Sequence, residues 1–432
     1  MEVRDPIHGA ITVGTDELAV LDHPFVQRLR NIRATGFSHL AFPGATHTRY
    51  SHSIGAMHLA GQAFDQAYRD FPFPDDRLRA RFRSLVRIAA LCHDLGHAPF
   101  SHSTEFAMPE LSSLHVPFYP RSLDRARRAT HEDYTIAILA SASLAATIGK
   151  KFPFTAAHVA SLISPDVPTD TDFFVVAGLD HRRILSQLIS SELDVDRLDY
   201  LRRDSYYTGT RYGQVDAEWI LGNLSAQIID DEVTLALDSR AIYAFDHFLL
   251  ARHHQYLMVY FHHKSVVYEE MLKRYVAAAS STWRIPADLD EYLRVDDIAL
   301  EYHHRQVDNP SARRITESRP YKRVVEKHGT PEQVDLTVEK DRLFDAGVGV
   351  IYTSSTGKLS RYEVVGKKRS RAPAILVLER MPGMPVDGVK TLSEASDVFQ
   401  RYADARRIAR LYVAPEDVAK ARSVLGLRPE GT

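Results

Sequence analysis

Histidines and aspartates that could bind a metal are concentrated in three stretches of this sequence. An adjacent pair, His93-Asp94, ends the apolar run LVRIAALCHDLGH, and three of the 21 histidines lie within residues 93–102. His52 precedes this pair, in THTRYSHSIGAMH, and the stretch SSELDVDRLDYLRRDS carries four aspartates among apolar residues. Those aspartates are Asp194, Asp196, Asp199 and Asp204. Because a buried imidazole or carboxylate is costly unless it has a partner, the pattern indicates a metal site.

A set of two imidazoles and two carboxylates is a mixed nitrogen and oxygen donor set. It suits manganese, iron(II), magnesium, nickel or zinc. Such a centre lowers the pKa of a bound water and polarises a phosphoryl oxygen, which is the chemistry of metal-assisted phosphoester hydrolysis. Each stretch also has a structural interpretation: a polar helix terminus for His93-Asp94, a structural histidine for His52, and a solvated helix face for the aspartates.

Composition excludes several other classes of protein. The chain has 432 residues, with 44% hydrophobic and 25% charged residues, as is ordinary for a globular protein. Its net charge of −2 disfavours bulk electrostatic capture of nucleic acid. Its single cysteine, Cys92, excludes a disulfide scaffold and a cysteine-based zinc site. The opening MEVRDPIHGAITV does not resemble a signal peptide and no apolar stretch is long enough to span a bilayer, so we expect a soluble cytoplasmic protein.

Hydrophobic periodicity predicts a mainly α fold with small β-hairpins and a mixed α+β C-terminal lobe. The helices that would carry the candidate residues are expected over 53–68, 75–97 and 181–205. Further helices are expected over 18–33, two or three within 130–163, and a long helix or broken pair over 240–279. A hairpin is expected over 228–237, strands over 344–354, 361–366 and 374–381, and a last helix over 393–413.

Several long motifs in this order resemble those of the HD-domain phosphohydrolase superfamily. They are DPIHG, FVQRLR, FPGATHTRYSHSIG, LCHDLGHAPFSH, THE and LDVDRLDYLRRD. In particular, these motifs resemble those of the SAM-and-HD-domain deoxynucleoside triphosphate triphosphohydrolases of animal cells and their bacterial relatives, from about Asp5 to about Val324. The resemblance implies an HD-domain helical core, with an HD phosphohydrolase domain over 1–285 and a C-terminal helical and α+β lobe over 286–432.

The resemblance also implies a role for each matching residue. His52, His93, Asp94 and Asp196 fall on the family's metal ligands. His102, Glu105 and His131 fall on its catalytic group, in which one of the two histidines would protonate the leaving 5′ oxygen and Glu105 would orient it. Arg49, Arg197 and Arg252 fall on phosphate contacts, and Tyr200, Asp204 and Tyr260 on positions that line the sugar and phosphates. Asp22, Gln27 and Arg30 match residues that bind an activating nucleotide. A homo-oligomer, dimer or tetramer, is expected by analogy.

Two departures from the family concern the choice of substrate. Ala34-Thr35 replaces a Gln-Leu pair that helps to read the sugar, and Phe261 replaces a glutamine. Losing a hydrogen-bonding group relaxes discrimination, so the substrate is either a (deoxy)nucleoside triphosphate or another nucleotide.

Three other functions remain open from the sequence. The first is a phosphatase or phosphodiesterase on another nucleotide, and the second is a nucleotide sensor that binds metal without turnover. The third is a nuclease, for which the only support is the local basic runs at 77–87 and 367–371.

Overall fold

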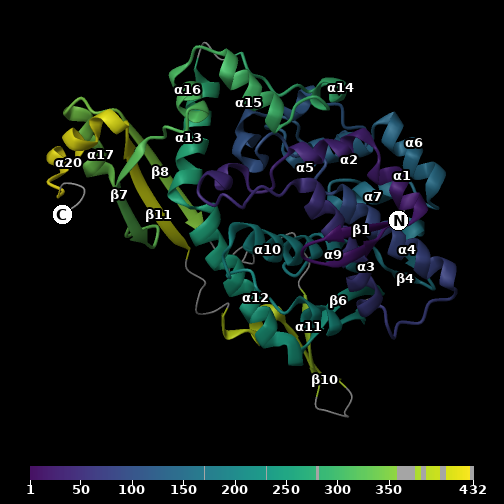
Figure 1. Ribbon diagram of the computed structural model, residues 1–432. Helices are drawn as coiled ribbons and strands as arrows, with labels where there is room; N and C mark the ends of the chain where they lie inside the picture. The colour runs from purple at the N-terminus through teal and green to yellow at the C-terminus, as the bar shows by residue number, and fades with distance from the viewer. Residues whose placement is uncertain are drawn as a thin grey trace.

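The protein has a large helical body and a small lobe that projects from it (Figure 1). The computed structural model describes residues 1–169, 171–229, 231–278, 282–357, 375–380, 386–398 and 405–428. The fold is mainly α with small sheets, as predicted. Among the described residues, no helix is both long and apolar enough to cross a membrane.

Most of the described helices belong to the body. They are α1 Thr15–Leu21, α2 Pro24–Arg28, α3 Arg49–Ala67, α4 Asp76–Cys92, α5 His131–Leu139, α6 Ala142–Lys151, α7 Ala156–Ile163, α8 Thr171–Phe174, α9 Arg182–Ile189, α10 Val195–Thr208, α11 Ala217–Gly222, α12 Ile242–Gln255, α13 His263–Ala277, α14 Leu289–Tyr292, α15 Asp297–Gln306, α16 Pro310–Thr316 and α18 Leu392–Ala395. A π-helical turn, Tyr256–Tyr260, separates α12 from α13, so the broken pair expected over 240–279 is confirmed.

The helices α3 and α4 pack against each other and form the centre of the body. Gly61 of α3 lies at this contact, where a Cβ atom would be 2.9 Å from Arg87 Nη1 of α4. α10 packs across α3 at Gly55, where a Cβ atom would lie 2.0 Å from Asp199 Oδ1. These contacts bring the three stretches singled out in the sequence to one place.

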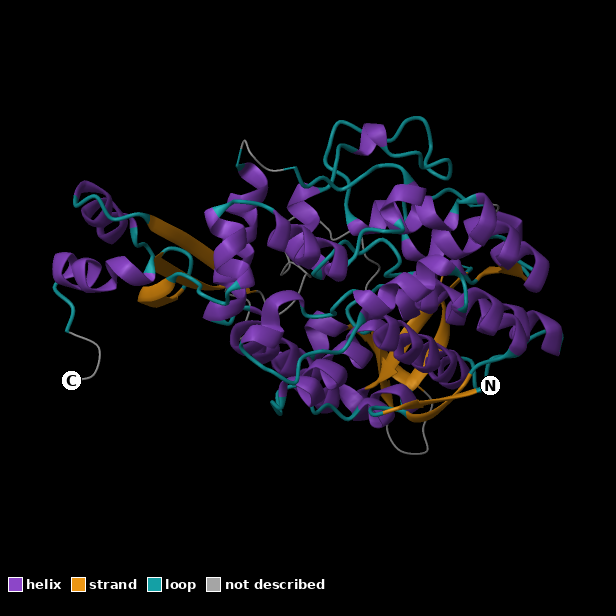
Figure 2. Ribbon diagram, turned by 45° about the horizontal axis from the view of Figure 1, so that its top comes forward, coloured by secondary structure: helices purple, strands orange, loops and turns teal. Residues whose placement is uncertain are grey.

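Two sheets belong to the body. β1 Glu2–Asp5 and β2 Gly9–Thr12 form an antiparallel hairpin. A six-stranded mixed sheet has the order β10-β9-β6-β4-β3, with β5 on the other edge of β6. Its strands are β3 Val175–Val176, β4 Leu179–Asp180, β5 Leu224–Ile229, β6 Glu232–Asp238, β9 Leu376–Arg380 and β10 Val386–Thr391. The expected hairpin at 228–237 and strand at 374–381 are therefore present as β5–β6 and β9. Helices surround these strands (Figure 2).

The lobe contains a three-stranded antiparallel sheet in the order β7-β11-β8. Its strands are β7 Lys322–Gly329, β8 Val350–Gly357 and β11 Arg406–Val413, and its helices are α17 Thr337–Asp345 and α20 Val418–Leu425. Apolar residues of the helices and strands form a core of their own, while Ile351 and Tyr412 join a second core with α13. The strands β9 and β10 come after β8 in the sequence but belong to the sheet of the body. The division of the chain into two domains at residues 285 and 286 stays a prediction.

Three predictions of helices were wrong. The helix over 18–33 is broken before Pro24, because the residue before a proline favours extended backbone and His23 has ψ of 138°. The helix over 181–205 is two helices, because Asp194 caps α10 by accepting a hydrogen bond from the Arg197 backbone N–H at 2.9 Å. The last helix was expected over 393–413, but residues 406–413 form the strand β11. The strand expected over 361–366 lies outside the described residues.

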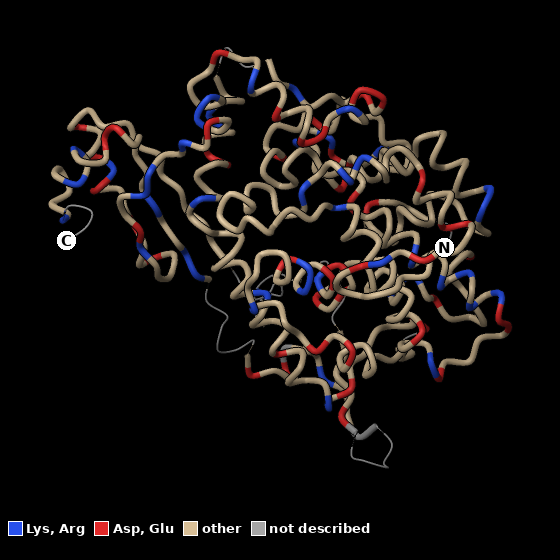
Figure 3. The backbone as a smooth tube through the Cα atoms, in the orientation of Figure 1, with Lys and Arg blue, Asp and Glu red and all other residues tan. Residues whose placement is uncertain are grey.

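Charges of both signs are mixed over the backbone trace (Figure 3). The basic run at 77–87 lies on α4, where Arg79 and Arg83 pair with Asp65, and Arg87 pairs with Glu17. These arginines are therefore partnered within the fold. The run at 367–371 lies outside the described residues.

Candidate metal centre and active site

Three helices place four potential metal ligands side by side. His52 lies in the first turn of α3, and Asp196 lies in the first turn of α10. α4 ends at Cys92, so His93 and Asp94 follow directly after its last turn rather than lying within it. His52 and Asp94 are buried, while the Asp196 side chain is 33% exposed. The cluster therefore has a closed side within the core and an open side toward solvent.

The ring nitrogens of His52 and His93 and a carboxylate oxygen of Asp94 lie within 4.8 Å of one another, as the ligands of one divalent cation would, and Asp196 lies beside both histidines. His52 Nε2 is 3.0 Å from Asp196 Oδ1 and 3.4 Å from His93 Nε2. His93 Nε2 is 3.4 Å from Asp94 Oδ1 and 3.5 Å from Asp196 Oδ1. Ligand atoms bound to one ion at about 2.0–2.2 Å are roughly 3–3.5 Å apart. The donor set thus fits a divalent metal ion, whose identity the four residues leave open.

The charge of the cluster also favours a cation. Burial disfavours a charged His52, but its contacts with Asp196 and Asp199 outweigh burial and raise the pKa of His52 to about 10. The carboxylates therefore attract a positive charge to this point. His52 Nδ1 lies 2.7 Å from Asp199 Oδ2, and His93 Nδ1 lies 2.7 Å from the Ala90 carbonyl oxygen. Both contacts direct the other ring nitrogen, Nε2, into the cluster.

A second group of side chains lies next to this cluster. Glu105 Oε1 is 2.7 Å from His131 Nδ1, and Glu105 Oε2 is 3.2 Å from His102 Nδ1. Glu105 also accepts a hydrogen bond from the His131 backbone N–H at 3.0 Å. Burial acts against the charged form of Glu105, but its bonds with His102 and His131 hold the pKa of this carboxyl well below its ordinary value. One carboxylate thus orients both candidate acids.

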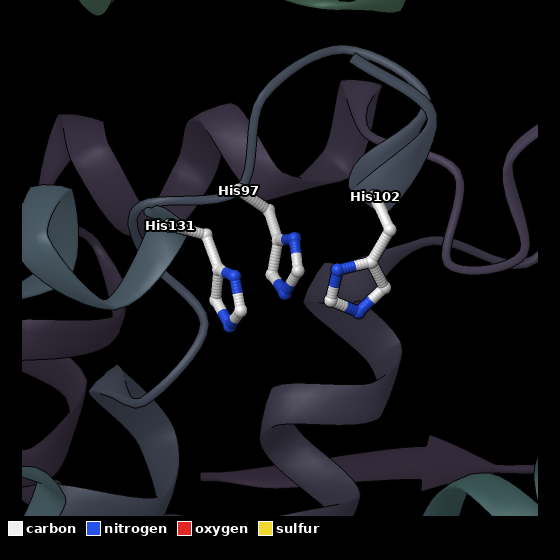
Figure 4. Close-up of side chains that lie close together, drawn as sticks. All are labelled: His97, His102 and His131. Carbon is white, nitrogen blue, oxygen red and sulfur yellow. The ribbon is translucent and has the colours of Figure 1, made fainter. Parts of the chain in front are cut away.

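His97 joins the two groups, and the sequence analysis did not assign it a role. Its Nε2 lies 3.2 Å from Asp94 Oδ1. The ring of His97 stacks on that of His131, with 4.1 Å between the ring centroids. The rings of His97, His102 and His131 all point toward one space (Figure 4). Their nitrogens are close enough to hold a metal ion as well. The close spacing of histidines in residues 93–102 was the available signal.

Comparisons with known proteins agree with this geometry. The HD domain family model matches residues 49–203, which include all four potential ligands and the histidine group, and the HD associated region model matches residues 215–343. The chain therefore contains an HD domain followed by an HD associated region. It is therefore related to metal-dependent hydrolases.

Relatives of this HD-domain protein occur in archaea, bacteria and eukaryotes. An uncharacterised protein of Methanocaldococcus jannaschii is 29% identical over 75% of this chain and 59% of its own length. The uncharacterised protein YwfO of Bacillus subtilis is 27% identical over 98% of this chain and 96% of its own. A deoxynucleoside triphosphate triphosphohydrolase SAMHD1 homolog of Dictyostelium discoideum is 29% identical over 69% of this chain and 54% of its own. The chain thus spans little more than half the length of the first and third relatives.

Solved structures share the fold over nearly the whole chain. A hypothetical protein from Aquifex aeolicus has a TM-score of 0.75 at 25% identity, covering 98% of this chain and 99% of its own. A phosphohydrolase from Bacteroides thetaiotaomicron has a TM-score of 0.66 at 22% identity, covering 96% and 99%. The second likeness concerns the fold alone.

Of the arginines expected to contact phosphate, one lies against a potential metal ligand and two lie beside other acidic residues. Arg49 Nη1 lies 2.6 Å from Asp94 Oδ2, next to the potential metal ligands. Arg197 and Arg252 are buried, and Arg252 Nη1 lies 3.2 Å from Glu192 Oε1. Arginine suits phosphate because its donors form a planar fork.

Two of the residues expected to line the sugar, Asp204 and Tyr260, are hydrogen-bonded to each other, and the third lies beside Tyr260. Tyr260 donates a hydrogen bond to Asp204 Oδ2 at 2.5 Å, and the ring of Tyr200 is 6.4 Å from that of Tyr260. His47, which the sequence analysis did not single out, has its Nε2 2.7 Å from Asp204 Oδ1. Thr35 is one of the two residues that replace the family's Gln-Leu pair, and its buried hydroxyl has no hydrogen-bond partner among the described residues.

The residues matched to an activating nucleotide lie together on the surface around α2. Gln27 donates to the Leu21 carbonyl at 2.7 Å, next to the exposed Asp22. Arg30 donates to Gln27 Oε1 at 2.7 Å, and its guanidinium lies over the ring of Tyr50 at 3.6 Å. Their role in binding a nucleotide stays a prediction.

Gly96 sets how closely α5 approaches the loop that follows α4. A Cβ atom here would lie 2.0 Å from the His131 carbonyl oxygen and 2.4 Å from the Thr135 backbone N. We expect Gly96→Ala to push the start of α5, with His131, away from Asp94, and to lower the free energy of unfolding by roughly 1–3 kcal/mol. Thermal melts and turnover measurements test this.

Gly149→Ala is the matched control. Gly149 is an exposed residue of α6, and a Cβ atom added there would have no described atom within 4 Å. Alanine there should raise the free energy of unfolding by up to about 1 kcal/mol, because alanine favours helix. Equal effects of the two substitutions would contradict the proposed close packing at Gly96.

Proposed function

We propose that this HD-domain protein hydrolyses (deoxy)nucleoside triphosphates to nucleoside and inorganic triphosphate, with a divalent metal at His52, His93, Asp94 and Asp196. The observation that carries the proposal is the position of Asp94. Its Oδ2 lies 2.6 Å from Arg49 and its Oδ1 lies 3.2 Å from His97, whose ring stacks on His131. Metal ligands, a phosphate-binding cation and a candidate acid thus adjoin one another.

The proposal gives each group of residues a role in the hydrolysis. When bound, the metal ion would polarise phosphoryl oxygens and favour ionisation of the attacking water. Arg49, Arg197 and Arg252 would hold the phosphate oxygens by charge-assisted hydrogen bonds. His102 or His131 would donate a proton to the leaving 5′ oxygen, while Glu105 favours the charged, donating form of the imidazole.

The name of the Dictyostelium relative supports the substrate class. The proposal includes assembly as a homo-oligomer, a dimer or tetramer, and an activating nucleotide at Asp22, Gln27 and Arg30. It also keeps the division into an HD phosphohydrolase domain over 1–285 and a C-terminal lobe over 286–432.

Product analysis tests the proposal. Metal-loaded protein is incubated with the four deoxynucleoside triphosphates, singly and mixed, and with the four ribonucleotides, and the products are separated by ion-exchange chromatography. We expect nucleoside and triphosphate, with turnover of single nucleotides rising when a second nucleotide is added if activation occurs. Metal-loaded protein that turns over none of these mixtures would overturn the proposal.

The second candidate is a phosphatase or phosphodiesterase on another nucleotide. Two observations favour it: Ala34-Thr35 replaces the family's sugar-reading pair, and the Thr35 hydroxyl is buried without a partner among the described residues. A site that lacks the usual donor loses its preference for that sugar. In the same chromatographic assay, release of orthophosphate instead of triphosphate would favour this function.

A further inference from the structure

The backbone immediately before His102 has an unusual conformation. Phe100 and Ser101 are successive non-glycine residues with φ of 56° and 57°, in the left-handed region. Such backbone persists only where surrounding contacts hold it, and it concentrates at functional sites. The residue that follows this pair is a candidate acid. The contacts that hold the pair therefore bear on where His102 lies.

Contacts to Ser101 and Ser103 come from several parts of the chain. Ser101 Oγ donates to the Arg33 carbonyl oxygen at 2.7 Å and accepts from Arg49 Nε at 2.9 Å. Ser103 Oγ donates to Glu269 Oε1 on α13 at 3.0 Å. These bonds fix side chains, so they restrain the left-handed backbone only indirectly.

Asp297 holds the left-handed backbone directly. This buried residue is the first of α15, and its Oδ1 accepts a hydrogen bond from the Phe100 backbone N–H at 2.6 Å. Its Oδ2 accepts from the Arg33 backbone N–H at 3.0 Å. One carboxylate thus joins the loop of His102 to the segment of Arg33, using both of its oxygens.

The segment around Asp297 holds the same loop at two earlier points. Tyr292 donates a hydrogen bond from its hydroxyl to the Gly96 carbonyl oxygen at 2.9 Å. Arg28 donates to the carbonyl oxygens of both His97, at 2.8 Å, and Val295, at 2.9 Å. The loop from Gly96 to Phe100 is therefore attached at three backbone groups to residues 292–297, directly or through Arg28. Residues 292–297 lie outside the residues that the HD domain model matches.

We propose that Asp297 is a positioning residue for the active site, which fixes the left-handed backbone at Phe100 and thereby places His102 beside Glu105. Asp297 acts through the backbone and does not touch the reacting atoms. The HD associated region, which contains Asp297, thus completes the geometry of the catalytic loop. This inference rests on the proposed hydrolase function.

Asp297→Asn tests the proposal with little change in shape. An amide has one oxygen, so it can accept from the Phe100 or the Arg33 N–H but not from both, and its NH₂ group faces the other donor. We expect kcat to fall by roughly 10- to 100-fold, because a small displacement of a catalytic group has an effect of this size. The KM and the amount of bound metal should change little, since the substrate and metal ligands are untouched. Hydrogen exchange at residues 98–104 should become faster.

Asp296→Ala is the matched control on the same helix end. Asp296 caps α15 by accepting from the Ala299 backbone N–H at 2.8 Å and accepts from Asn31 Nδ2 at 2.9 Å, and no contact joins it to the described residues of the loop. This variant should lower the melting temperature at least as much as Asp297→Asn. Its kcat and its exchange at residues 98–104 should stay near those of the unmodified protein.

Hydrogen exchange at residues 98–104 and kcat together distinguish a failure of the positioning role from a failure of the proposed function. Unchanged exchange at residues 98–104 in Asp297→Asn would overturn the positioning role, whatever the activity. An equal loss of kcat in Asp296→Ala would also overturn it, because the effect would then follow helix stability. If the unmodified protein hydrolyses no nucleotide, the proposed function fails, and the exchange measurement still decides whether Asp297 holds the loop.

Discussion

Replacing His93 by alanine should remove the metal and reduce turnover by roughly three orders of magnitude or more. His93 Nε2 lies 3.4 Å from the nearest atoms of both His52 and Asp94. Its loss leaves one nitrogen donor and two carboxylates. A bound metal contributes several kcal/mol of transition-state stabilisation, and each 1.36 kcal/mol is a factor of ten in rate. Elemental analysis after dialysis, Mn²⁺ titration calorimetry and turnover measure the effect.

His115→Ala is the control for this experiment. His115 is an exposed histidine outside both histidine groups. The control should keep the metal content and turnover of the unmodified protein. Unaltered Mn²⁺ affinity in His93→Ala would show that the four-residue cluster is not the metal site.

The second large effect is expected for Glu105→Gln, with the metal retained. The amide keeps the shape of Glu105 but removes the negative charge that lies 2.7 Å from His131 Nδ1 and 3.2 Å from His102 Nδ1. General acid catalysis contributes typically 10²–10⁴-fold, so we expect kcat to fall by roughly 10²- to 10³-fold. Metal content should stay unchanged because Glu105 contacts none of the four ligands among the described residues.

The pH dependence of kcat should also change in Glu105→Gln, in a direction that can be predicted. A general acid must be protonated, so activity is lost as the pH rises through its pKa. Burial lowers the pKa of His102, and Glu105 opposes this effect because its carboxylate favours the protonated imidazole. Removing its charge should therefore move the alkaline limb of the kcat profile to lower pH. A limb at the unchanged pH, or one moved upward, would exclude Glu105 as the partner of the acid.

The candidate metal ligands could be proposed from the sequence because they lie in long, specific motifs, and their role as ligands stays a prediction. His52, His93 and Asp94 could be identified from residue type and motif, and Asp196 could be chosen among four aspartates only through the family resemblance. The structure shows that a neighbouring aspartate, Asp199, has another task, since it bonds the far ring nitrogen of His52. That distinction depends on the helical position of each residue.

Contacts between distant segments could not be predicted from the sequence. Nothing in the sequence around Asp297 indicates that it binds the backbone of Phe100, because the two are 197 positions apart along the chain and the contact requires the packing of α15. The strand β11 was mistaken for a helix because its arginines suit a helical pattern. Arg410 is buried instead, with Glu326 as its partner in β7.

The path of the chain between body and lobe affects how the protein is made. After β8 the chain returns to the body, where β9 pairs in parallel with β6, and it then goes back to the lobe for β11, the central strand between β7 and β8. During synthesis, β7 and β8 leave the ribosome before β11, the strand that lies between them. In the same way, β6 is made long before its partner β9. The edges of β7 and β8 stay unpaired until residues 406–413 have been made. We infer that the lobe closes late, and that a chain cut before β11 exposes strands able to pair with other chains.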